Sequence, residues 1–370
     1  MKILSVVGTR PNFMKMAPII AAFRDRAPQV RHVLVHTGQH YDARMSGSFF
    51  ADLQMPAPDH NLAVGSGSHA QMTAAVMTLL EPVLEAEKPD LVLVVGDVNS
   101  TLAAAITAKK LNMTVGHVEA GLRSGDMTMP EEINRLCVDA IADHLFTTDR
   151  LADENLLREG VKPERIHFVG NVMIDSLMAH LKVAEKLAYH TTLGLAPGSY
   201  GTLTLHRPAN VEEPEKLDEI LSAIATAAPD LPVVFPIHPR TRSRIEKFGF
   251  ADRFVAKPGL PGIYLTDPLG YVEFLSLNRH ARLVMTDSGG LQEETTILGV
   301  PCVTLRDNTE RPITITQGTN RLGGTSRDGI IKAIGEAMAL GLAHGKRPEK
   351  WDGHAAERIV DLVVSGFGKP

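Results

Sequence analysis

The most regular feature of the chain is an alternation of short apolar runs with amphipathic segments of helical period. The runs are rich in Val, Ile and Leu and nearly continuous, as is typical of strands buried on both faces. Such strands separated by helices predict parallel sheets covered by helices, an α/β fold. The predicted strands are Ile3–Val7, His32–His36, Leu91–Val95, Val115–Val118, His144–Thr147 and Ile166–Val169, then Thr202–Leu205, Val233–Ile237, Ile263–Leu265, Leu283–Thr286 and Cys302–Leu305, and the predicted helices include Met14–Arg24, Gln71–Glu87, Thr101–Lys110 and Glu131–Ala142.

Two successive series of strands and helices suggest two Rossmann-like domains. A chain of 370 residues is too long for one ordinary hydrophobic core, which favours the same division. We place the join near Gly170, ahead of a helix predicted over Met173–Ala188. The N-terminal domain then spans residues 1–170 and the C-terminal domain spans residues 171–354. A last helix, within about 355–370, is expected to dock back onto the first domain and is assigned to it.

Composition is that of a soluble globular protein, with 44% apolar and 22% charged residues. The net charge of −5 provides no basic footprint for nucleic acid and no polybasic patch for a membrane. The N-terminal apolar run is too short for a signal peptide, and no segment has the apolar length of a membrane span. Cys137 and Cys302 lie in apolar patterns without metal-type spacing, which predicts buried free thiols in a reducing compartment. We therefore expect a cytoplasmic protein.

The residues that follow the predicted strands are unusually polar, and ligands of open α/β sheets bind beyond the carboxyl ends of strands. After the first strand, Arg10 and Lys15 flank a helix N-terminus, where two cations suit a diphosphate. The alternative is a solvated turn with Lys15 on the helix surface. Asp97 follows the third strand. It either caps the next helix or, because Asn99 and Ser100 are available as caps, faces a ligand.

More carboxylates follow the fourth strand. Glu119 ends an apolar run, where a charge is costly unless it is hydrogen-bonded or exposed to a site. The alternative is a structural pair with Arg123. Glu131 opens the next predicted helix and has capping-box spacing to Thr128, so it is either a cap or a functional acid. Arg135 lies one turn further on the same helix face.

The second half of the chain carries a pattern that suits a phosphate. The predicted strand Leu283–Thr286 leads into Ser288, Gly289 and Gly290, and a helical pattern follows. This arrangement offers backbone N–H groups and a helix N-terminus to an anion. Glu294 lies within the first turn of that pattern, where a carboxylate can hold a ribose hydroxyl. The alternative is that the glycines only permit a tight turn.

Two histidines and one aromatic residue complete the candidates in this half. His206 and His238 each follow a predicted strand, which places them where an open α/β sheet binds its ligand. The alternative for each is a structural histidine. Phe274 lies inside a helical pattern and is either a core residue or a stacking platform for a base.

Taken together, these stretches resemble the non-hydrolysing UDP-N-acetylglucosamine 2-epimerase family. Each motif is weak alone, but the set recurs in order at spacings consistent with that family. The motifs are Gly8-Thr9-Arg10-Pro11, Gly96-Asp97, His117-Val118-Glu119-Ala120-Gly121-Leu122-Arg123, Pro130-Glu131-Glu132-Ile133-Asn134-Arg135, Thr286-Asp287-Ser288-Gly289-Gly290-Leu291-Gln292-Glu293-Glu294 and Thr309-Glu310-Arg311-Pro312.

The resemblance implies two Rossmann-like domains of the glycosyltransferase-B type, with the active site in the interdomain cleft. It also implies a homodimer that requires neither a metal nor a nicotinamide cofactor. By position, it makes Asp97, Glu119 and Glu131 the acid/base carboxylates, and His206 completes the catalytic set. The residues it assigns to the substrate are Arg10 and Lys15 at the nucleotide sugar or its diphosphate, Ser288, Gly289 and Gly290 at phosphate, Glu294 at the ribose, Phe274 against the uracil, and Arg311 in the rest of the binding region. From their positions in the sequence, Arg135 and His238 are also expected to bind substrate.

The chain departs from familiar members of that family at three positions. Asn12 replaces a common Glu, which leaves the turn around Arg10 and Lys15 more cationic. Leu269 stands where some members place a polar side chain near the uracil, so base recognition is expected to rest on backbone groups. Ala75 stands where effector-regulated bacterial members carry Arg, which argues against allosteric activation by UDP-N-acetylglucosamine.

The implied reaction interconverts UDP-N-acetylglucosamine and UDP-N-acetylmannosamine by inverting C2. The C2 hydrogen is not acidic, because no carbonyl is bonded to that carbon. Elimination of UDP to a 2-acetamidoglucal, followed by re-addition, inverts C2 without a redox cofactor. Carboxylates serve the proton transfers and cationic or N–H groups serve the departing diphosphate. Which carboxylate is the base and which is the acid stays open.

Four other functions compete with this interpretation. A 2-epimerase for a related UDP-N-acylated sugar would use the same residues. A glycosyltransferase of the same architecture would not need three carboxylates at the strand ends of the first domain. A hydrolysing epimerase would release UDP and free N-acetylmannosamine, whereas the Gly8-Thr9-Arg10-Pro11 turn favours the non-hydrolysing branch. A nucleotide-sugar sensor without turnover is disfavoured because all three carboxylates are present.

Overall fold

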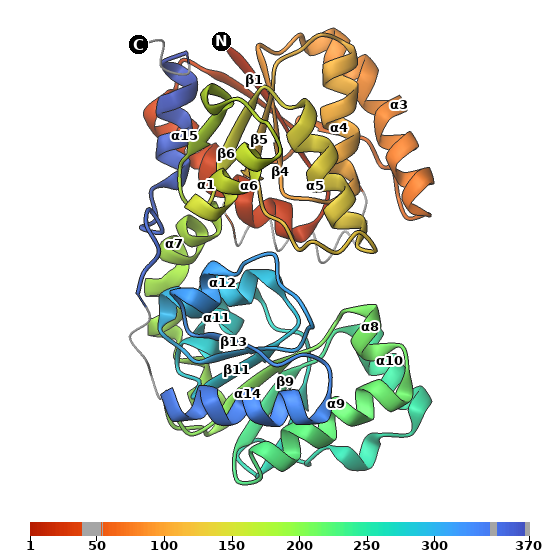
Figure 1. Cartoon of the computed structure of the whole chain (residues 1–370), viewed down its shortest axis with the longest axis vertical. Helices are drawn as coiled ribbons and strands as arrows, with labels where there is room; N and C mark the ends of the chain where they lie inside the picture. The colour runs from red at the N-terminus through yellow and green to blue at the C-terminus, as the bar shows by residue number, and fades with distance from the viewer. Residues whose placement is uncertain (39–52, 54, 341–345, 367–370) are drawn as a thin grey trace. The chain divides into compact units, whose positions relative to one another are not determined.

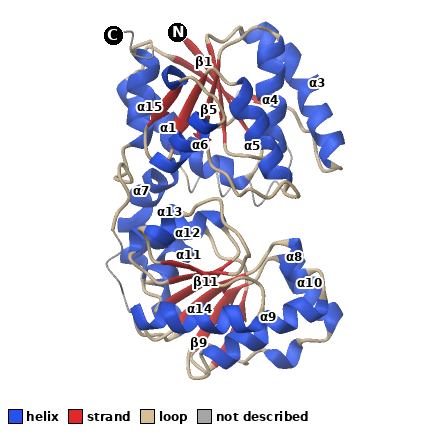
Figure 2. Ribbon diagram, viewed as in Figure 1, coloured by secondary structure: helices blue, strands red, loops and turns tan. Residues whose placement is uncertain are grey.

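The computed structural model describes residues 1–38, 53, 55–340 and 346–366. It separates into two compact units, Met1–Ser176 with Glu349–Pro370, and Leu177–Pro348 (Figure 1). In each unit the described strands form one parallel sheet, and helices lie on both sides of the strands (Figure 2). The predicted fold class, two Rossmann-like α/β domains, is confirmed.

The first unit contains a seven-stranded sheet of order β3-β2-β1-β4-β5-β6-β7 among the described residues. Its strands are β1 (Lys2–Val7), β2 (Arg31–His36), β3 (His60–Asn61), β4 (Leu91–Val95), β5 (Val115–Ala120), β6 (His144–Thr147) and β7 (Ile166–Phe168), and its helices are α1 (Arg10–Arg26), α3 (His69–Glu87), α4 (Asn99–Lys110), α5 (Pro130–Ile141), α6 (Arg150–Arg158), the 3₁₀ turn Pro163–Arg165 and α15 (Ala355–Val364). Helix α7 (Val172–Leu187) carries the chain into the second unit.

The second unit contains a six-stranded sheet of order β10-β9-β8-β11-β12-β13 among the described residues. Its strands are β8 (Gly201–Thr204), β9 (Pro232–Pro236), β10 (Gly262–Thr266), β11 (Leu283–Thr286), β12 (Cys302–Thr304) and β13 (Asn320–Leu322), and its helices are α8 (Pro208–Val211), α9 (Pro214–Ala227), α10 (Pro239–Phe248), α11 (Tyr271–Arg279), α12 (Gly289–Leu298), α13 (Ile313–Thr316), α14 (Arg327–Leu340) and the 3₁₀ turns Tyr189–Leu193 and Ala251–Arg253.

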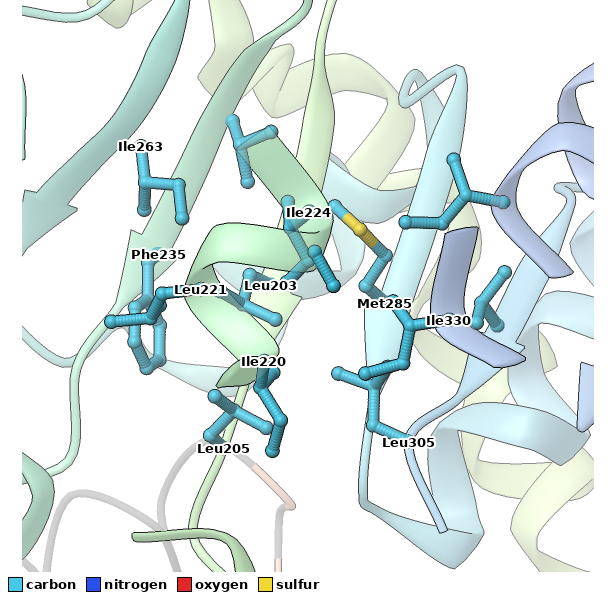
Figure 3. Close-up of a cluster of buried hydrophobic side chains, with 14 of the residues drawn as sticks. Leu203, Leu205, Ile220, Leu221, Ile224, Phe235, Ile263, Met285, Leu305 and Ile330 are labelled. Carbon is cyan, nitrogen blue, oxygen red and sulfur yellow. The ribbon is translucent and has the colours of Figure 1, made fainter. Parts of the chain in front are cut away.

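A buried apolar layer holds the helices of the second unit to its sheet. Figure 3 shows Ile220 and Ile224 of α9 beside Leu203 of β8 and Met285 of β11. Each of these four side chains is at most 1% exposed. Since burial of one such side chain contributes about 1.5–3 kcal/mol, this layer fixes where the strands end and therefore where the polar residues beyond them lie.

Helix α15 returns to the first unit and closes its surface. Asp175 of α7 accepts hydrogen bonds from the backbone N–H groups of Ala355 and Ala356, at 3.1 and 2.6 Å, and so caps α15. Arg26 at the end of α1 forms an ion pair with Asp361 of α15 at 2.9 Å. The C-terminal helix therefore packs in the same unit as β1 and α1.

Several local predictions are corrected by the structure. Helix α12 begins at Gly289 and not after Gly290, so both glycines lie in its first turn. Strands β3 and β13 were not predicted because each is very short and lacks an apolar run. Cys137 is exposed, whereas Cys302 is buried as expected, and both are free thiols. Among the described residues, no helix is long and apolar enough to cross a membrane.

Candidate active site

Both sheets reverse their strand order at one point, and most of the candidate residues follow the strands there. In the first sheet the reversal lies between β1 and β4, and in the second between β8 and β11. A crevice forms beyond the carboxyl ends of the strands at such a point, where loops leave in opposite directions. Arg10 and Asp97 follow β1 and β4, and His206 and Ser288 follow β8 and β11. The topology therefore gathers the candidates of each unit at one edge of its sheet.

Glu119 lies in a strained segment at the end of β5. Its φ of +70° is in the left-handed region, which costs a residue with a side chain about 1–2 kcal/mol. The pairing of β5 with β6 shifts register between Val118 and Ala120, so Glu119 is the bulged residue. The carboxylate forms an ion pair with Lys15 of α1, and the two side chains are only 5% and 7% exposed. Lys15 is therefore not on the helix surface.

Asn12 and Gly96 connect the loops that follow β1 and β4. The Asn12 side-chain N–H group donates to the Val95 carbonyl at 2.8 Å, and its oxygen accepts from the backbone N–H groups of Gly8 and Thr9 at 3.2 Å. A carboxylate at position 12 has no proton to donate to that carbonyl. Gly96 has a φ of +70°, and a Cβ there would lie 3.0 Å from the Lys15 ammonium nitrogen. A side chain at position 96 would thus crowd the ion pair.

Asp97 is held by Arg135 of α5. The Arg135 guanidinium forms an ion pair with the Asp97 carboxylate, and it also donates to Glu132 at 2.6 and 2.9 Å. Arg135 is 1% exposed, whereas the Asp97 side chain retains 23% exposure. Asn134 donates to the Asp97 carbonyl at 2.8 Å. The same helix thus fixes both the backbone and the carboxylate of Asp97.

Neither Asp97 nor Glu131 caps a helix, which was the alternative role of each. Helix α4 begins at Asn99 after Val98, and no side chain caps it, so neither Asp97 nor Ser100 has that role. Helix α5 begins at Pro130 after Met129, again without a side-chain cap. Glu131 is half-buried in the first turn of α5. The capping-box interpretation of Glu131 is therefore wrong.

Glu132, the neighbour of Glu131, is a structural carboxylate that the sequence pattern did not single out. It is 2% exposed and accepts from the backbone N–H groups of Ser124 and Gly125 at 3.0 and 2.9 Å. Burial opposes ionisation, but these hydrogen bonds and the Arg135 guanidinium together lower the pKa of Glu132. Glu132 is thus an ionised anchor for Arg135 and for the loop that follows β5.

In the second unit, His206 is oriented by Asp287. The His206 Nδ1 atom lies 2.6 Å from the Asp287 carboxylate, and the His206 side chain is 51% exposed. The other Asp287 oxygen accepts from the backbone N–H groups of His206 and Arg207, each at 2.9 Å, and from Asn210 at 3.1 Å. Burial opposes ionisation of Asp287, but these contacts lower its pKa. With Nδ1 held by a carboxylate, Nε2 is the atom that His206 offers to a ligand.

Glu294 is buried at the second turn of α12. Its carboxylate accepts a hydrogen bond from the Tyr271 hydroxyl at 3.0 Å. Burial raises the pKa of Glu294 to about 7; the Tyr271 hydrogen bond opposes this shift, and the Glu293 carboxylate adds to it. Burial also raises the pKa of Tyr271. Glu294 is therefore a hydrogen-bonding group whose charge changes near neutral pH.

Arg311 packs against the first turn of α12. Its guanidinium forms ion pairs with Glu293 at 2.8 Å and with Glu310, and all three residues are at most 6% exposed. A Cβ at Gly289 would lie 2.5 Å from the Arg311 Nη1 atom. Gly289 is thus a glycine because Arg311 occupies the space of a side chain. Ser288, Gly289 and Gly290 remain partly accessible at the N-terminus of this helix.

The described contacts of the remaining candidates, His238, Phe274 and Arg10, do not indicate a particular chemical role. His238 is exposed between β9 and α10, and Phe274 is half-buried in α11. Arg10 is the first residue of α1, and its side chain lies outside the described part of the structure. Within the described ranges, no group of three or more His, Cys, Asp or Glu side chains is arranged to hold a metal ion.

Comparisons with known proteins identify the family of the chain. Two parallel α/β units with polar strand ends define a protein of the glycosyltransferase-B fold type. A family model described as UDP-N-acetylglucosamine 2-epimerase matches residues 23–364. The chain therefore belongs to the UDP-N-acetylglucosamine 2-epimerase family, which is a family of isomerases.

Individual relatives cover essentially the whole chain. The UDP-N-acetylglucosamine 2-epimerase of Methanocaldococcus jannaschii is 42% identical over 372 residues, which is 99% of this chain and 100% of the relative. The UDP-2,3-diacetamido-2,3-dideoxy-D-glucuronate 2-epimerase of Pseudomonas aeruginosa is also 42% identical, over 98% of this chain and 99% of the relative. The crystal structure of the M. jannaschii protein in complex with UDP-GlcNAc and UDP is similar to this chain with a TM-score of 0.90 and 41% identity, over 99% of this chain and 100% of that one.

Because Glu294 is buried, we expect the free energy of unfolding to depend on pH. Between about 4.5 and 7 the folded state keeps a proton that the unfolded state has lost, so stability falls as pH rises through this range and the loss is complete above pH 7. Glu294→Gln removes this loss, and we expect it to gain on the wild type by on the order of 2–3 kcal/mol at pH 8 and by nothing at pH 4. Thermal unfolding across this range measures the difference. A gain that does not change with pH, or an equal gain in the exposed control Glu336→Gln, would contradict the prediction.

Proposed function

We propose that the chain interconverts UDP-N-acetylglucosamine and UDP-N-acetylmannosamine by reversible inversion of C2, without releasing UDP to solution. The observation that carries this proposal is a pair of carboxylates at the carboxyl ends of the neighbouring strands β4 and β5, Asp97 beside Arg135 and Glu119 beside Lys15. Inversion of a non-acidic carbon requires proton removal on one face and proton delivery on the other. Two or more carboxylates held at the same sheet edge meet that requirement.

The chemistry we assign to the site is an elimination followed by an addition. A carboxylate takes the proton from C2, the C1–C2 double bond forms, and the C1–O bond breaks with its electron pair leaving on UDP. The resulting 2-acetamidoglucal then receives UDP again at C1 and a proton at C2 on the opposite face. Asp97, Glu119 and Glu131 are the proposed acid/base groups, and each is already close to a strand end or the first turn of α5.

The second unit is proposed to hold UDP through the elimination. The N-terminus of α12 at Ser288, Gly289 and Gly290 has backbone N–H groups for phosphate oxygens. Glu294 is proposed at the ribose, Phe274 at the uracil, and His206 Nε2 at the departing diphosphate. In this proposal turnover depends on residues of both units, since the acid/base groups belong to the first unit and the UDP-binding groups to the second.

Within this proposal, Arg135, Arg311 and Lys15 mainly pair with carboxylates of their own unit and contact the substrate less than predicted. Arg135 and Arg311 are each buried against two carboxylates of their own unit. Lys15 is likewise neutralised by Glu119. We propose that Arg135 and Arg311 hold site groups in place, and that Lys15 serves Glu119 first and the diphosphate only when substrate binds. Arg10 is left as the proposed diphosphate cation after β1.

A related UDP-N-acylated sugar is a second candidate substrate. The P. aeruginosa relative, named for a UDP-2,3-diacetamido-2,3-dideoxy-D-glucuronate, is as similar to this chain as the M. jannaschii relative, at 42% identity. Elimination across C1 and C2 requires the same carboxylates for both sugars, so these residues do not separate the two. Comparison of kcat/KM for the two nucleotide sugars decides between them.

Hydrogen exchange at C2 tests the proposed reaction. We expect protein incubated with UDP-N-acetylglucosamine in D₂O to place deuterium at C2 of both epimers while UDP stays attached, as followed by NMR. Asp97→Asn is the matched variant: it should retain UDP binding and lose exchange. Folded protein without C2 exchange would refute epimerisation by proton transfer. Accumulation of free UDP and N-acetylmannosamine would instead favour the hydrolysing reaction, and sugar transfer to an acceptor without exchange would favour a glycosyltransferase.

We also propose a homodimer and a cytoplasmic location. In support of the dimer, an apolar groove of about 370 Å³ lies between α3, α4 and α5 and is lined partly by Met77, Leu102 and Ile133. Ile133 is 43% exposed in this groove, and a second copy of the chain would cover it. Light scattering is expected to give twice the mass of one chain. A single-chain mass throughout the micromolar range would exclude the dimer.

A further inference from the structure

Helix α5 carries a buried carboxylate that has no role in the reaction as proposed above. Asp139 lies two turns after Glu131 and is 1% exposed. Its Oδ1 atom is 2.6 Å from His117 Nδ1, and its Oδ2 atom accepts from the Gly121 N–H group at 3.0 Å and from Arg123 at 2.8 Å. All three partners belong to β5 or to the loop that follows it. Asp139 therefore connects α5 to the end of β5.

The contacts of Asp139 lie on both sides of Glu119. His117 is two residues before Glu119, and Gly121 is two residues after it. Between them the backbone passes through the bulge and the left-handed φ of Glu119. A strained conformation persists only where the surrounding structure over-determines it. One carboxylate that binds both ends of a five-residue segment supplies that constraint.

The second ring nitrogen of His117 extends the connection to Asp97. His117 Nε2 lies 2.8 Å from the carbonyl oxygen of Gly96, the residue before Asp97. A carbonyl oxygen and an ionised carboxylate only accept hydrogen bonds, so both contacts are hydrogen bonds only when both nitrogens of His117 carry a proton. His117 is 0% exposed, so no solvent competes with these two acceptors. Burial opposes ionisation of Asp139, but His117 and Arg123 lower the pKa of that carboxyl, in agreement with an ion pair.

We infer that the buried His117–Asp139 ion pair is a positioning device that sets the carboxylates of Glu119 and Asp97 relative to one another. A buried ion pair contributes little net free energy to folding, because the cost of desolvating the two charges offsets most of their attraction. A pair of apolar side chains in the same place is often as stabilising. Here the ion pair determines how the segments that it connects are oriented. It fixes the bulge at Glu119 and the loop before Asp97 to one helix, and that helix also carries Glu131 and Arg135. The catalytic consequence rests on the proposed function, whereas the charge state of His117 does not.

Asp139→Asn tests the positioning role. The amide keeps the size of the side chain but cannot pair with an imidazolium and bind Gly121 and Arg123 as before. We expect kcat to fall roughly 10- to 100-fold, as displacement of reacting groups by an ångström does, while KM and the affinity for UDP change less than about twofold. Asp149→Asn is the matched control: Asp149 is 4% exposed in the same unit and accepts from the Ala152 N–H group at 3.0 Å as the cap of α6. It should lack this separation of kcat from KM. A folded Asp139→Asn protein with wild-type kcat would overturn the inference.

A second experiment measures the charge of His117 in the wild-type protein, without an activity assay and without a substitution at Asp139. In protein labelled with ¹⁵N-histidine, long-range ¹H–¹⁵N spectra distinguish an imidazolium from either neutral tautomer, and the signal missing in His117→Gln assigns His117 among the 15 histidines. We expect both His117 ring nitrogens to be protonated in the wild type at pH 7. A neutral His117 would overturn the inference even if epimerisation is observed. An imidazolium in a protein without epimerase activity would instead refute the proposed function and retain the ion pair.

Discussion

Carboxylates at the end of a buried parallel strand stay charged when cations or hydrogen-bond donors of the same chain lie against them. Desolvation of an ionised carboxylate costs several kcal/mol, and this cost is offset only by well-placed partners. Lys15 offsets it for Glu119, and Arg135 offsets it for Asp97 and Glu132. These pairs explain why basic residues follow the strands of a chain with a net charge of −5. The positions of the acid groups, and hence the proposed chemistry, depend on these pairings.

In the second unit, buried residues likewise hold the groups that we propose bind the nucleotide. Its partly accessible groups, Ser288 and His206, are supported by residues that are themselves buried: Arg311 packs against the first turn of α12, and Asp287 holds His206 by its Nδ1 atom. Glu294 is the exception, because its main partner is a tyrosine and burial therefore raises its pKa to about 7. Proton transfer in one unit and nucleotide binding in the other is the division of labour that we propose for the reaction.

The sequence predicted the fold well because local apolar runs indicate which strands are buried. It made Asp97 and Glu119 candidates because each follows or ends such a run. It did not identify Asp139, which looks like an ordinary polar position of an amphipathic helix until β5 packs against it. Its spacing of four from Arg135 was the available signal, since both must then lie on one helix face. Asp287 was within a recognised motif, but its partner comes from the loop after β8. Cys137 was misjudged because an apolar neighbourhood in sequence does not decide which helix face is buried.

In the reaction that we propose, the chain breaks and re-forms the bond between C1 and the UDP oxygen while its carboxylates move the C2 proton. Positional isotope exchange tests this claim most directly. UDP-N-acetylglucosamine that carries ¹⁸O at the bridging anomeric oxygen is incubated with the protein, and the label is located by ³¹P NMR. Cleavage and re-addition predict that ¹⁸O moves from the bridge into the non-bridging positions of the β-phosphate. Epimerisation at C2 with the label retained entirely in the bridge would contradict the account.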